Sequence, residues 1–511
     1  MGEGLVYFFD SLLSFLTPHH LFNILWATQL GIIIGMLPGL TATMGVALLT
    51  TLTFNMEPDS AILVLLCLYI GAVYGGSRSA ILLNIPGTPA NAATSVDGFP
   101  LARKGLAGKA IGLATTSSFL GSAVGLLVLA LFTPLLGDFA LKFKSFEFFW
   151  LAVFGVVICG NLTSPVSPIK GWIAGFLGLF ISTIGGESMH AFNRFSFGSV
   201  ELSGGIHLIP AMVGAFGFAE ILAVMTQKDS GVVHSKIDRV IPRIKDLLKY
   251  WKTIIRSGIV GTFIGAVPGV GEDIAAWTSY DLAKRSSKHP EEFGRGSMEG
   301  LIASETGNSA AVSGSMIPVL ALAIPGSTSA AILLAAMIIH GVQPGPLLMI
   351  ENPEFIYQVV AMVFLGMTAM MILGVSMVRP LVKVLTIPRE NLMPVVFVLC
   401  VIGSFAIQAR LFDIGVMVVF GIIGYLMKEM DYPIAPLVLG IILGVILDKN
   451  FIRALVLSEG DVSQFVESPI SITIALITFY SLVGRTKIVM AVKGKINQTF
   501  KQIFRIASKT D

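Results

Sequence analysis

Apolar segments separated by short polar ones follow one another along almost the whole chain. Thirteen of them are long enough to enter or cross a bilayer, whose hydrocarbon core is spanned by a helix of about 20 residues. This pattern predicts an all-α polytopic membrane protein. The apolar segments lie at 20–54, 60–96, 108–135, 147–160, 168–184, 205–226, 254–283, 300–340, 355–378, 391–408, 411–427, 433–447 and 468–484.

Four of these segments are longer than one span needs and are interrupted by Pro-Gly. Proline lacks a backbone donor and clashes with the preceding turn, and glycine adopts dihedrals that other residues avoid, so the pair ends a helix. Backbone groups freed within a membrane are tolerated only where protein or a water-filled cavity satisfies them. We therefore expect broken helices or hairpins that meet near mid-membrane. The interrupted segments are 20–54, 60–96, 254–283 and 300–340, with breaks at Pro38-Gly39, Pro86-Gly87, Pro268-Gly269 and Pro325-Gly326.

The four breaks form two matching pairs in the same order. GMLPGL at 35–40 resembles GAVPGV at 265–270, and NIPGT at 84–88 resembles AIPGS at 323–327. The paired prolines are 230 and 239 residues apart. This spacing predicts an internal duplication of about half the chain, as in transporters built from two repeats. We expect a first half at 1–226, a basic linker at 227–253, a second half at 254–484 and a basic tail at 485–511.

The charges of the loops indicate that the two halves are inverted, because Lys and Arg accumulate on the cytoplasmic side. Residues 1–19 contain acidic side chains and no Lys or Arg, whereas 97–109 contains three basic residues. In the second half the order reverses: 227–256 holds eight Lys and Arg, and 340–354 holds none. We expect the N-terminus outside and the C-terminus inside. The loop at 136–147, with Lys142 and Lys144, disagrees with this topology.

Composition excludes several functional classes. Only 13% of the 511 residues are charged and 54% are hydrophobic, with a mean hydropathy of +0.83. Ordinary soluble domains are about one quarter charged, so a soluble enzyme is excluded and lipid must solvate much of the chain. A net charge of +3, without a basic patch interleaved with aromatic residues, excludes nucleic acid as a partner. No HExxH or P-loop motif is present, and we do not expect an enzyme.

Polar residues around the breaks are the candidate substrate site. The N-termini of half-helices offer unpaired N–H groups and a positive dipole end to an anion. Alternatively, the hydroxyl groups only repair the interrupted helices by bonding to nearby backbone groups. The candidate substrate-binding residues are Pro38, Gly39, Thr41, Thr43, Asn84, Pro86, Gly87, Thr88, Pro268, Gly269, Pro325, Gly326, Ser327 and Thr328.

Ionisable residues within the interrupted segments are candidates for ion coupling, because charged groups are costly in a membrane and usually face a pathway or a partner. Glu272 and Asp273 follow the third break. Glu305 lies in the fourth segment and shares a helix face with Asn308. Their carboxylate and amide oxygens suit a hard cation such as Na+, and a carboxylate alone could carry a proton. Alternatively, Glu272 and Asp273 lie at a water interface.

Arg78 is the only basic residue between 60 and 96. Its guanidinium could pair with a carboxylate substrate through two parallel hydrogen bonds. The interpretation that we favour is that Arg78 lies at the cytoplasmic end of its helix and extends its charge towards water.

Four long motifs resemble the large membrane subunit of the bacterial tripartite tricarboxylate transporters. They cover the breaks in both halves, and the resemblance extends over essentially the whole chain. The motifs are GMLPGLTATMGVALLT at 35–50, YGGSRSAILLNIPGTPANAATSVDGFPLARKGLAGKAIG at 74–112, GTFIGAVPGVGEDIAAWTSYDLAKRSSKHPEEFGRG at 261–296 and EGLIASETGNSAAVSGSMIPVLALAIPGSTSAAILLAAMIIHGVQPGPLL at 299–348.

The resemblance implies a secondary transporter that imports di- or tricarboxylates such as citrate, driven by a Na+ or proton gradient, with no other cofactor. It implies a place in the bacterial inner membrane, a small four-helix membrane partner subunit and a periplasmic solute-binding protein.

The chain departs from the family pattern at two places. Glu272 and Asp273 stand where small residues are common, and SETGNS at 304–309 replaces PEAANN, which keeps Glu305 and Asn308. An intramembrane enzyme acting on a lipid or peptide is the alternative function.

Overall fold

The structure is a computed structural model that describes residues 2–37, 40–163, 167–187, 192–226, 240, 242, 244–378, 380, 389–406 and 408–483. Within these ranges the helices are joined by turns and loops, and the strands are one short antiparallel pair, β1 (Gly185–Gly186) with β2 (Asn193–Arg194). Seven of the described helices are long and apolar enough to cross a membrane. The prediction of an all-α polytopic membrane protein is confirmed.

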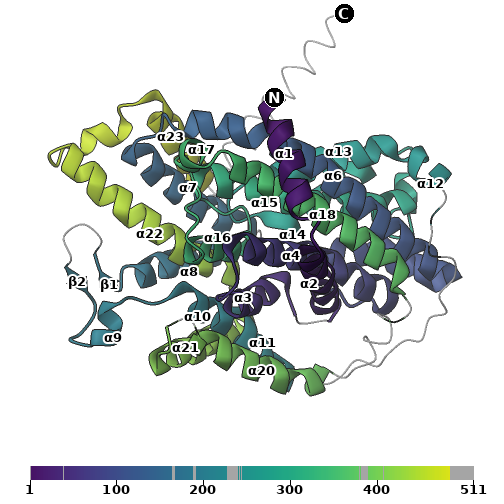
Figure 1. Ribbon diagram of the computed structural model, residues 1–511, viewed down its shortest axis with the longest axis horizontal. Coiled ribbons are helices and arrows are strands. Elements are labelled where there is room, and N and C mark those ends of the chain that lie inside the picture. The colour runs from purple at the N-terminus through teal and green to yellow at the C-terminus, as the bar shows by residue number, and fades with distance from the viewer. Residues whose placement is uncertain are drawn as a thin grey trace, which may run out of the picture.

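The first half of the chain begins with a short helix and continues through two broken helix pairs into longer helices (Figure 1). A π-helical segment, η1 (Ala102–Leu106), precedes the longest helix, and Gly105 within it has a φ of 80°. The helices are α1 (Gly2–Ser14), α2 (Pro18–Met36), α3 (Ala42–Leu52), α4 (Pro58–Leu83), α5 (Asn91–Leu101), α6 (Ala107–Ala140), α7 (Ser145–Thr163) and α8 (Pro168–Ser182).

The second half repeats the two broken pairs after a series of short elements. The elements that precede and form these pairs are α9 (Val200–Ser203), α10 (Leu208–Met212), the π-helix η2 (Val213–Phe218), α11 (Ala219–Thr226), α12 (Ile244–Lys249), α13 (Trp251–Gly265), α14 (Gly271–Ser286), the 3-10 helix η3 (Pro290–Glu292), α15 (Met298–Leu322) and α16 (Thr328–Ile339). The remaining elements are α17 (Leu348–Glu351), α18 (Glu354–Ser376), α20 (Arg389–Ala406), α21 (Leu411–Glu429), α22 (Ile434–Leu457), the 3-10 helix η4 (Val462–Val466) and α23 (Pro469–Val483).

All four predicted breaks separate two helices. Pro38 and Gly39 lie outside the described residues, but α2 ends before them and α3 begins after them. The second and fourth breaks have the same geometry, because α4 and α15 are each followed by a capping residue in the left-handed conformation. These residues are Asn84, with a φ of 57°, and Ala323, with a φ of 56°. They are 239 residues apart, which is the spacing of the paired prolines.

Glycine contacts recur at matching positions in the two halves. A Cβ on Gly35 of α2 would lie 1.9 Å from the carbonyl oxygen of Ala72 in α4. A Cβ on Gly265 of α13 would lie 2.5 Å from the carbonyl oxygen of Ala311 in α15. Gly35 and Gly265 are 230 residues apart, and Ala72 and Ala311 are 239 residues apart. In each half, the helix before the first break therefore packs against the helix before the second break, α2 against α4 and α13 against α15, through equivalent backbone contacts.

The two equivalent long helices, α4 and α15, cross at the centre of the molecule and run antiparallel. Residues further along α4 contact residues that come earlier in α15. The pairs that show this are Tyr69 with Ser315, Val73 with Asn308, and Ser77 with Glu305. An antiparallel pair of equivalent helices is the arrangement that an inverted repeat requires. The residue limits of the two halves stay a prediction, and most of the linker and all of the tail lie outside the described residues.

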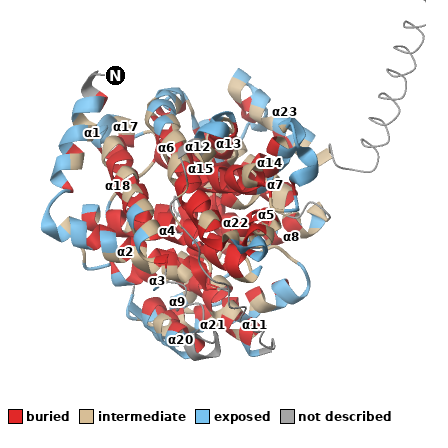
Figure 2. Cartoon of the chain, turned by 90° about the vertical axis from the view of Figure 1, so that its right-hand side faces the viewer, coloured by how far each residue is buried: buried red, intermediate tan, exposed pale blue. Residues whose placement is uncertain are grey.

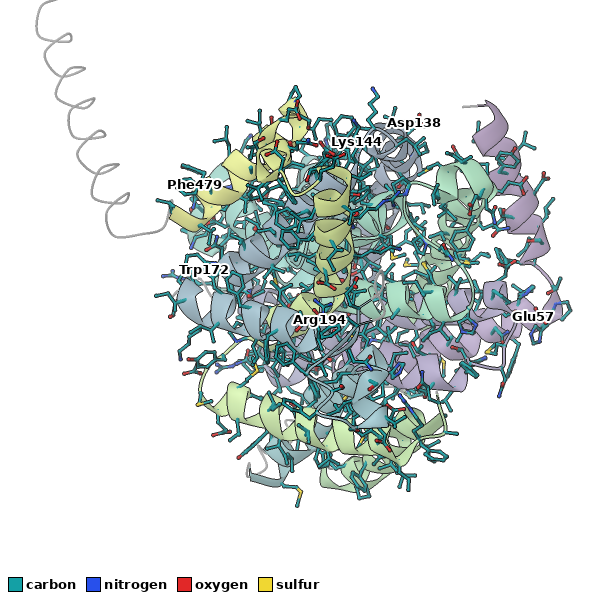
Figure 3. The ribbon with its side chains drawn as sticks, turned by 90° about the vertical axis from the view of Figure 1, so that its left-hand side faces the viewer. Glu57, Asp138, Lys144, Trp172, Arg194 and Phe479 are labelled. Atoms are coloured by element: carbon teal, nitrogen blue, oxygen red, sulfur yellow. The ribbon has the colours of Figure 1, made fainter. Side chains whose placement is uncertain are left out.

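Burial is concentrated on these central helices, whereas the outer helices expose apolar side chains (Figure 2). Every residue from 60 to 82 in α4 and from 300 to 322 in α15 is buried. Trp172 of α8 and Phe479 of α23 lie on the periphery (Figure 3). Asp138 and Lys144, from the region that disagreed with the predicted topology, lie at the same end of the molecule in that view. The fully buried central helices are thus surrounded by helices that expose apolar side chains, as expected of a protein in a membrane.

Candidate transport site

The four breaks gather around one cavity of about 540 Å³. Its wall includes the starts of three half-helices, α3, α14 and α16, and the residues just before the start of α5. The residues from the breaks that line it are Thr41, Ala42, Thr43, Thr88, Pro89, Gly269, Val270, Gly271, Glu272, Asp273, Ser327 and Thr328. Segments from both halves of the chain therefore place polar and charged side chains in the wall of one cavity.

Three helix N-termini lie in the wall of this cavity and that of α5 lies next to it, and each carries a partial positive charge. Two of them are capped by hydroxyl groups, since Thr41 Oγ1 accepts a hydrogen bond from Met44 N at 3.2 Å and Ser327 Oγ accepts one from Ala330 N at 3.1 Å. The hydroxyl groups of Thr41 and Ser327 therefore do bond to backbone groups at the helix ends, as the alternative prediction stated. This bonding is compatible with a binding role, because the same residues line the cavity.

Glu272, in the first turn of α14, is buried in the cavity wall and accepts hydrogen bonds from both halves. Tyr69 Oη of α4 donates to Glu272 Oε2 at 3.1 Å, and Ser329 Oγ of α16 lies 3.4 Å from Oε1. Tyr69 Oη also lies 2.9 Å from Ser327 Oγ. Thr43 Oγ1 joins this network at 3.0 Å from Ser329 Oγ. Glu272 therefore lies in the wall of the cavity and not on the outer surface, and the alternative of a water interface stays a prediction.

Asp273 lies beside Glu272 on the cavity wall and contacts the second break. Its Oδ1 accepts a hydrogen bond of 3.0 Å from the backbone N–H of Ala90, the residue before α5. The carboxylate thus connects the start of α14 with the start of α5. Two acidic side chains and four positive helix ends lie in or next to the wall of one cavity, which balances charge locally.

Glu305 occupies a second buried polar site that does not line the cavity. Ser77 Oγ of α4 donates to Oε2 at 2.7 Å, and Ser118 Oγ of α6 donates to the same oxygen at 2.9 Å. Thr94 of α5 donates to Oε1. Asn308 is buried one turn further along α15, where its Nδ2 lies 3.4 Å from the carbonyl oxygen of Val73. The four acidic and amide residues predicted for ion coupling are therefore divided between two places.

Several predicted substrate residues shape the breaks without lining the cavity. Asn84 is exposed and ends α4. Gly87 and Gly326 lie against backbone, since a Cβ on either would come within 2.1 Å of the carbonyl oxygen of Gly35 or Gly265. The others that do not line the cavity are Pro86, Pro268 and Pro325.

The interpretation that Arg78 extends to water is wrong. Its side chain is fully buried in α4. Nη2 donates to the carbonyl oxygen of Gly374 at 2.6 Å and to Tyr74 Oη at 3.1 Å. The guanidinium therefore faces α18 and does not line the cavity.

The cavity also contains a lysine that sequence reasoning missed. Lys428 Nζ, near the end of α21, lies 2.6 Å from Glu220 Oε2 of α11, and both residues line the cavity. In the sequence Lys428 stands at the edge of an apolar segment, where a basic residue is usually a loop charge. Tyr69 was missed because it lies within a continuous apolar run, and neither position carried a local signal for the site.

A second cavity, of about 480 Å³, contains none of the predicted site residues. It lies among α10, α16 and α22 and is almost entirely apolar; His207 and Gln408 are the polar side chains in its wall. It adds no chemistry to the site.

These features define a polytopic helical membrane protein whose broken helices surround a polar cavity. The model of the tripartite tricarboxylate transporter TctA family matches residues 21–439, and the chain belongs to this family. It is thus a membrane subunit of a transport system, and membership of a tripartite family implies partner subunits.

Two proteins of Agrobacterium vitis are similar to the chain. One, described as an uncharacterized 52.8 kDa protein in the TAR-I ttuC′ 3′ region, is 36% identical over 487 residues, which cover 94% of this chain and 95% of that protein. The other, an uncharacterized protein in the TAR-II ttuC′ 3′ region, is 33% identical over 244 residues, covering 48% of this chain and 98% of that protein. No solved structure matches the chain.

Proposed function

We propose that the chain is the transport subunit of an ion-coupled importer of organic carboxylate anions, such as the di- and tricarboxylates that include citrate. The observation that carries this proposal is the meeting of four half-helix N-termini around one cavity. Backbone N–H groups and helix dipoles at such ends favour carboxylates. The cavity volume, about 540 Å³, is in the range of small-molecule sites.

The charges in the cavity support coupling to a cation. A carboxylate substrate would approach Glu272 and Asp273, and like charges at close range repel each other. Positive helix ends and Lys428 reduce this repulsion, and a coupling ion, Na+ or a proton, would reduce it further. We therefore assign substrate binding to the cavity and ion coupling to Glu272, Asp273, Glu305 and Asn308.

The position of the ion pair supports a particular state of the transporter. Glu220 lies in α11, which leads into the basic linker that we place in the cytoplasm. Lys428 lies in the last turn of α21 beside it. We propose an inner-membrane protein with a periplasmic N-terminus and a cytoplasmic C-terminus, whose cavity faces the cytoplasm here. Movement of the broken helices would open it to the periplasm, where a solute-binding protein delivers substrate. A small four-helix membrane subunit completes the system.

An intramembrane enzyme is the less supported function. Two equivalent helix sets that cross antiparallel supply two related faces, which alternating access uses and catalysis does not require. We therefore propose a transporter without catalytic residues.

Reconstitution tests the proposal. The chain, together with its partner subunits, is placed in liposomes and supplied with radiolabelled citrate, malate, succinate or tartrate under a Na+ or proton gradient. We expect gradient-dependent uptake of at least one carboxylate. Cysteines introduced as Thr43→Cys and Ser327→Cys should react with a membrane-impermeant reagent from the cytoplasmic side, and substrate should slow the reaction. Absence of uptake for the whole panel, with labelling indifferent to substrate, contradicts the proposal.

A further inference from the structure

Glu305 lacks a basic partner among the residues that the structure describes. Its carboxylate is fully buried, and the groups that bond to it are three hydroxyls, from Ser77, Thr94 and Ser118. Arg78, the residue after Ser77, directs its guanidinium to Tyr74 and Gly374 instead. A buried carboxylate without a positive partner is costly in a protein interior and more costly in a membrane.

The groups around Glu305 are ligands that a small hard cation prefers. They are oxygen atoms: two from one carboxylate and one from each of three hydroxyls. A further oxygen is available, since Asn308 Oδ1 is buried and has no hydrogen-bond partner in the described structure. Asn308 and Glu305 contact α4 at Val73 and Ser77, one turn apart, so both side chains face the same helix. One carboxylate among neutral oxygens is neutralised by a single positive charge.

A chain of side-chain hydrogen bonds connects this site with the cavity. Thr88 Oγ1, on the cavity wall, donates to Asn91 Oδ1 at 2.6 Å. Asn91 Nδ2 donates to Ser77 Oγ at 3.2 Å, and Ser77 Oγ donates to Glu305 Oε2 at 2.7 Å. Thr88, Asn91 and Ser77 are buried, so water does not compete freely for these bonds.

We propose that Glu305 is the centre of a Na+ site separate from the substrate cavity, and that Thr88, Asn91 and Ser77 link its occupancy to the cavity. A Na+ ion beside Glu305 takes a lone pair of Ser77 Oγ, which fixes the Asn91 amide and thereby the Thr88 hydroxyl. A carboxylate that draws the Thr88 hydroxyl towards the cavity acts on the same chain from the other end. Asn91 is a positioning residue in this scheme. The linkage deepens the proposed transport function, whereas Na+ binding itself does not depend on it.

Direct binding of ²²Na+ to the purified full-length chain in nanodiscs tests the site without any carboxylate. We expect saturable binding that Glu305→Gln abolishes and that Glu305→Asp, which keeps the charge on a shorter side chain, weakens by about tenfold. Ser79→Ala, which removes a buried hydroxyl bonded to Gly76 of the same helix, should bind as the wild type does. Undiminished binding in Glu305→Gln overturns the site, and so does the absence of Na+ binding in the wild type.

A cysteine at the cavity tests the link. Ile274 lines the cavity, and Ile274→Cys can be introduced after the three buried native cysteines are replaced by alanine. We expect Na+ to change the labelling rate of this cysteine several-fold. Asn91→Ala should remove that change while ²²Na+ binding stays within about threefold of its original affinity. Ser95→Ala, on the same helix with a bond to Ala92, should leave the response intact.

The alternatives give distinct results. A Na+ response that survives Asn91→Ala contradicts the link and leaves the site standing. A labelling rate of the Ile274→Cys variant that responds to pH but not to Na+ contradicts the link, whereas the absence of ²²Na+ binding contradicts the Na+ site. None of these results depends on carboxylate uptake, so failure of the proposed transport function would be seen separately, in the liposome experiment.

Discussion

Helices α4 and α15 occupy equivalent places in the two halves, yet they perform different tasks. Their backbones are packed alike, each against the glycines of its preceding broken helix. Their polar groups differ: Tyr69 of α4 corresponds to Asn308 of α15, and Leu66 corresponds to Glu305, each 239 residues on. The comparison teaches that the two helices share their backbone contacts and differ in their polar chemistry.

The two halves of the chain contribute different groups to both polar sites. The second half supplies the carboxylates, Glu272 and Glu305. Helix α4 of the first half supplies a hydroxyl to each of them, from Tyr69 and Ser77, two turns apart on one face. Both polar sites therefore form only when the two halves meet, which ties any ion or substrate bound there to the relative position of the halves.

The largest expected effect tests the shared backbone packing. Gly35→Val and Gly265→Val should both prevent accumulation of folded protein, because even a Cβ would overlap a carbonyl oxygen in the neighbouring helix. The amount of monodisperse protein after extraction measures this effect. Gly415→Ala is the control, since nothing lies within 4 Å of a Cβ there. If only one of the two valine variants is lost, the halves are not packed equivalently.

The next largest effect tests the polar groups by which α4 and α15 differ. Tyr69→Phe removes the hydroxyl that donates to Glu272 and contacts Ser327, without changing the shape of α4. We expect uptake to fall about tenfold, because Glu272 and Ser327 line the cavity and a hydrogen bond to a charged group contributes about 1.5–3 kcal/mol. Tyr425→Phe, in the outer helix α21, is the matched control. A large fall in melting temperature with normal specific uptake would assign Tyr69 to stability instead.

A smaller effect concerns the cavity lysine, which has no counterpart in the duplicated core. Lys428→Gln should raise the KM for the carboxylate several-fold, with kcat less affected, because a charge on the cavity wall attracts the anion. The increase should shrink at high salt, since about two fifths of the side chain is exposed. Glu220→Gln frees the lysine and should lower KM. Equal KM values in both variants would exclude an electrostatic role for the pair.

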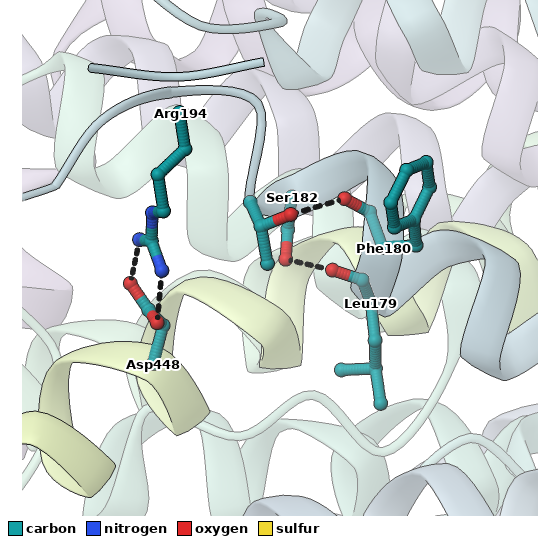
Figure 4. A network of polar contacts seen from close by, with 6 residues as sticks. Leu179, Phe180, Ser182, Arg194 and Asp448 are labelled. Atoms are coloured by element: carbon teal, nitrogen blue, oxygen red, sulfur yellow. Dashed lines mark hydrogen bonds and ion pairs between the residues drawn. The ribbon is translucent and has the colours of Figure 1, made fainter.

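The smallest effect lies far from the core. Arg194 of β2 and Asp448 of α22 form a two-pronged ion pair, and in the same view Ser182 bonds to Leu179 (Figure 4). Arg194→Lys keeps the charge and loses the second hydrogen bond. Because both side chains are partly exposed, the stability should fall by no more than about 1 kcal/mol. Thermal unfolding in detergent measures it, with uptake unchanged; a larger loss would show that the short hairpin supports the core.

The sequence was informative where the backbone chemistry is local. Pro-Gly ends helices wherever it occurs, so the breaks and their pairing could be predicted, and charged residues in apolar segments pointed to Glu272 and Glu305. The separation of these two acids into different sites could not be predicted. Helical spacing places Glu305 and Asn308 on one face, but which neighbour covers that face depends on long-range packing. The role of Tyr69 depends on the same packing, since an apolar run conceals its hydroxyl.

The glycine contacts described above also determine where the molecule can shear. Between α2 and α4, and between α13 and α15, backbone touches backbone, and such contacts leave no side chain that could change rotamer during a slide. Between α4 and α15 the described polar contacts are made by side chains, which can exchange partners at small cost. We expect each closely packed helix pair, α2 with α4 and α13 with α15, to move as one rigid body. The two bodies would slide against each other where α4 contacts α15. Both carboxylate sites lie along the contact between α4 and α15, so an ion bound at either site would hold the two rigid bodies in one relative position until it dissociates.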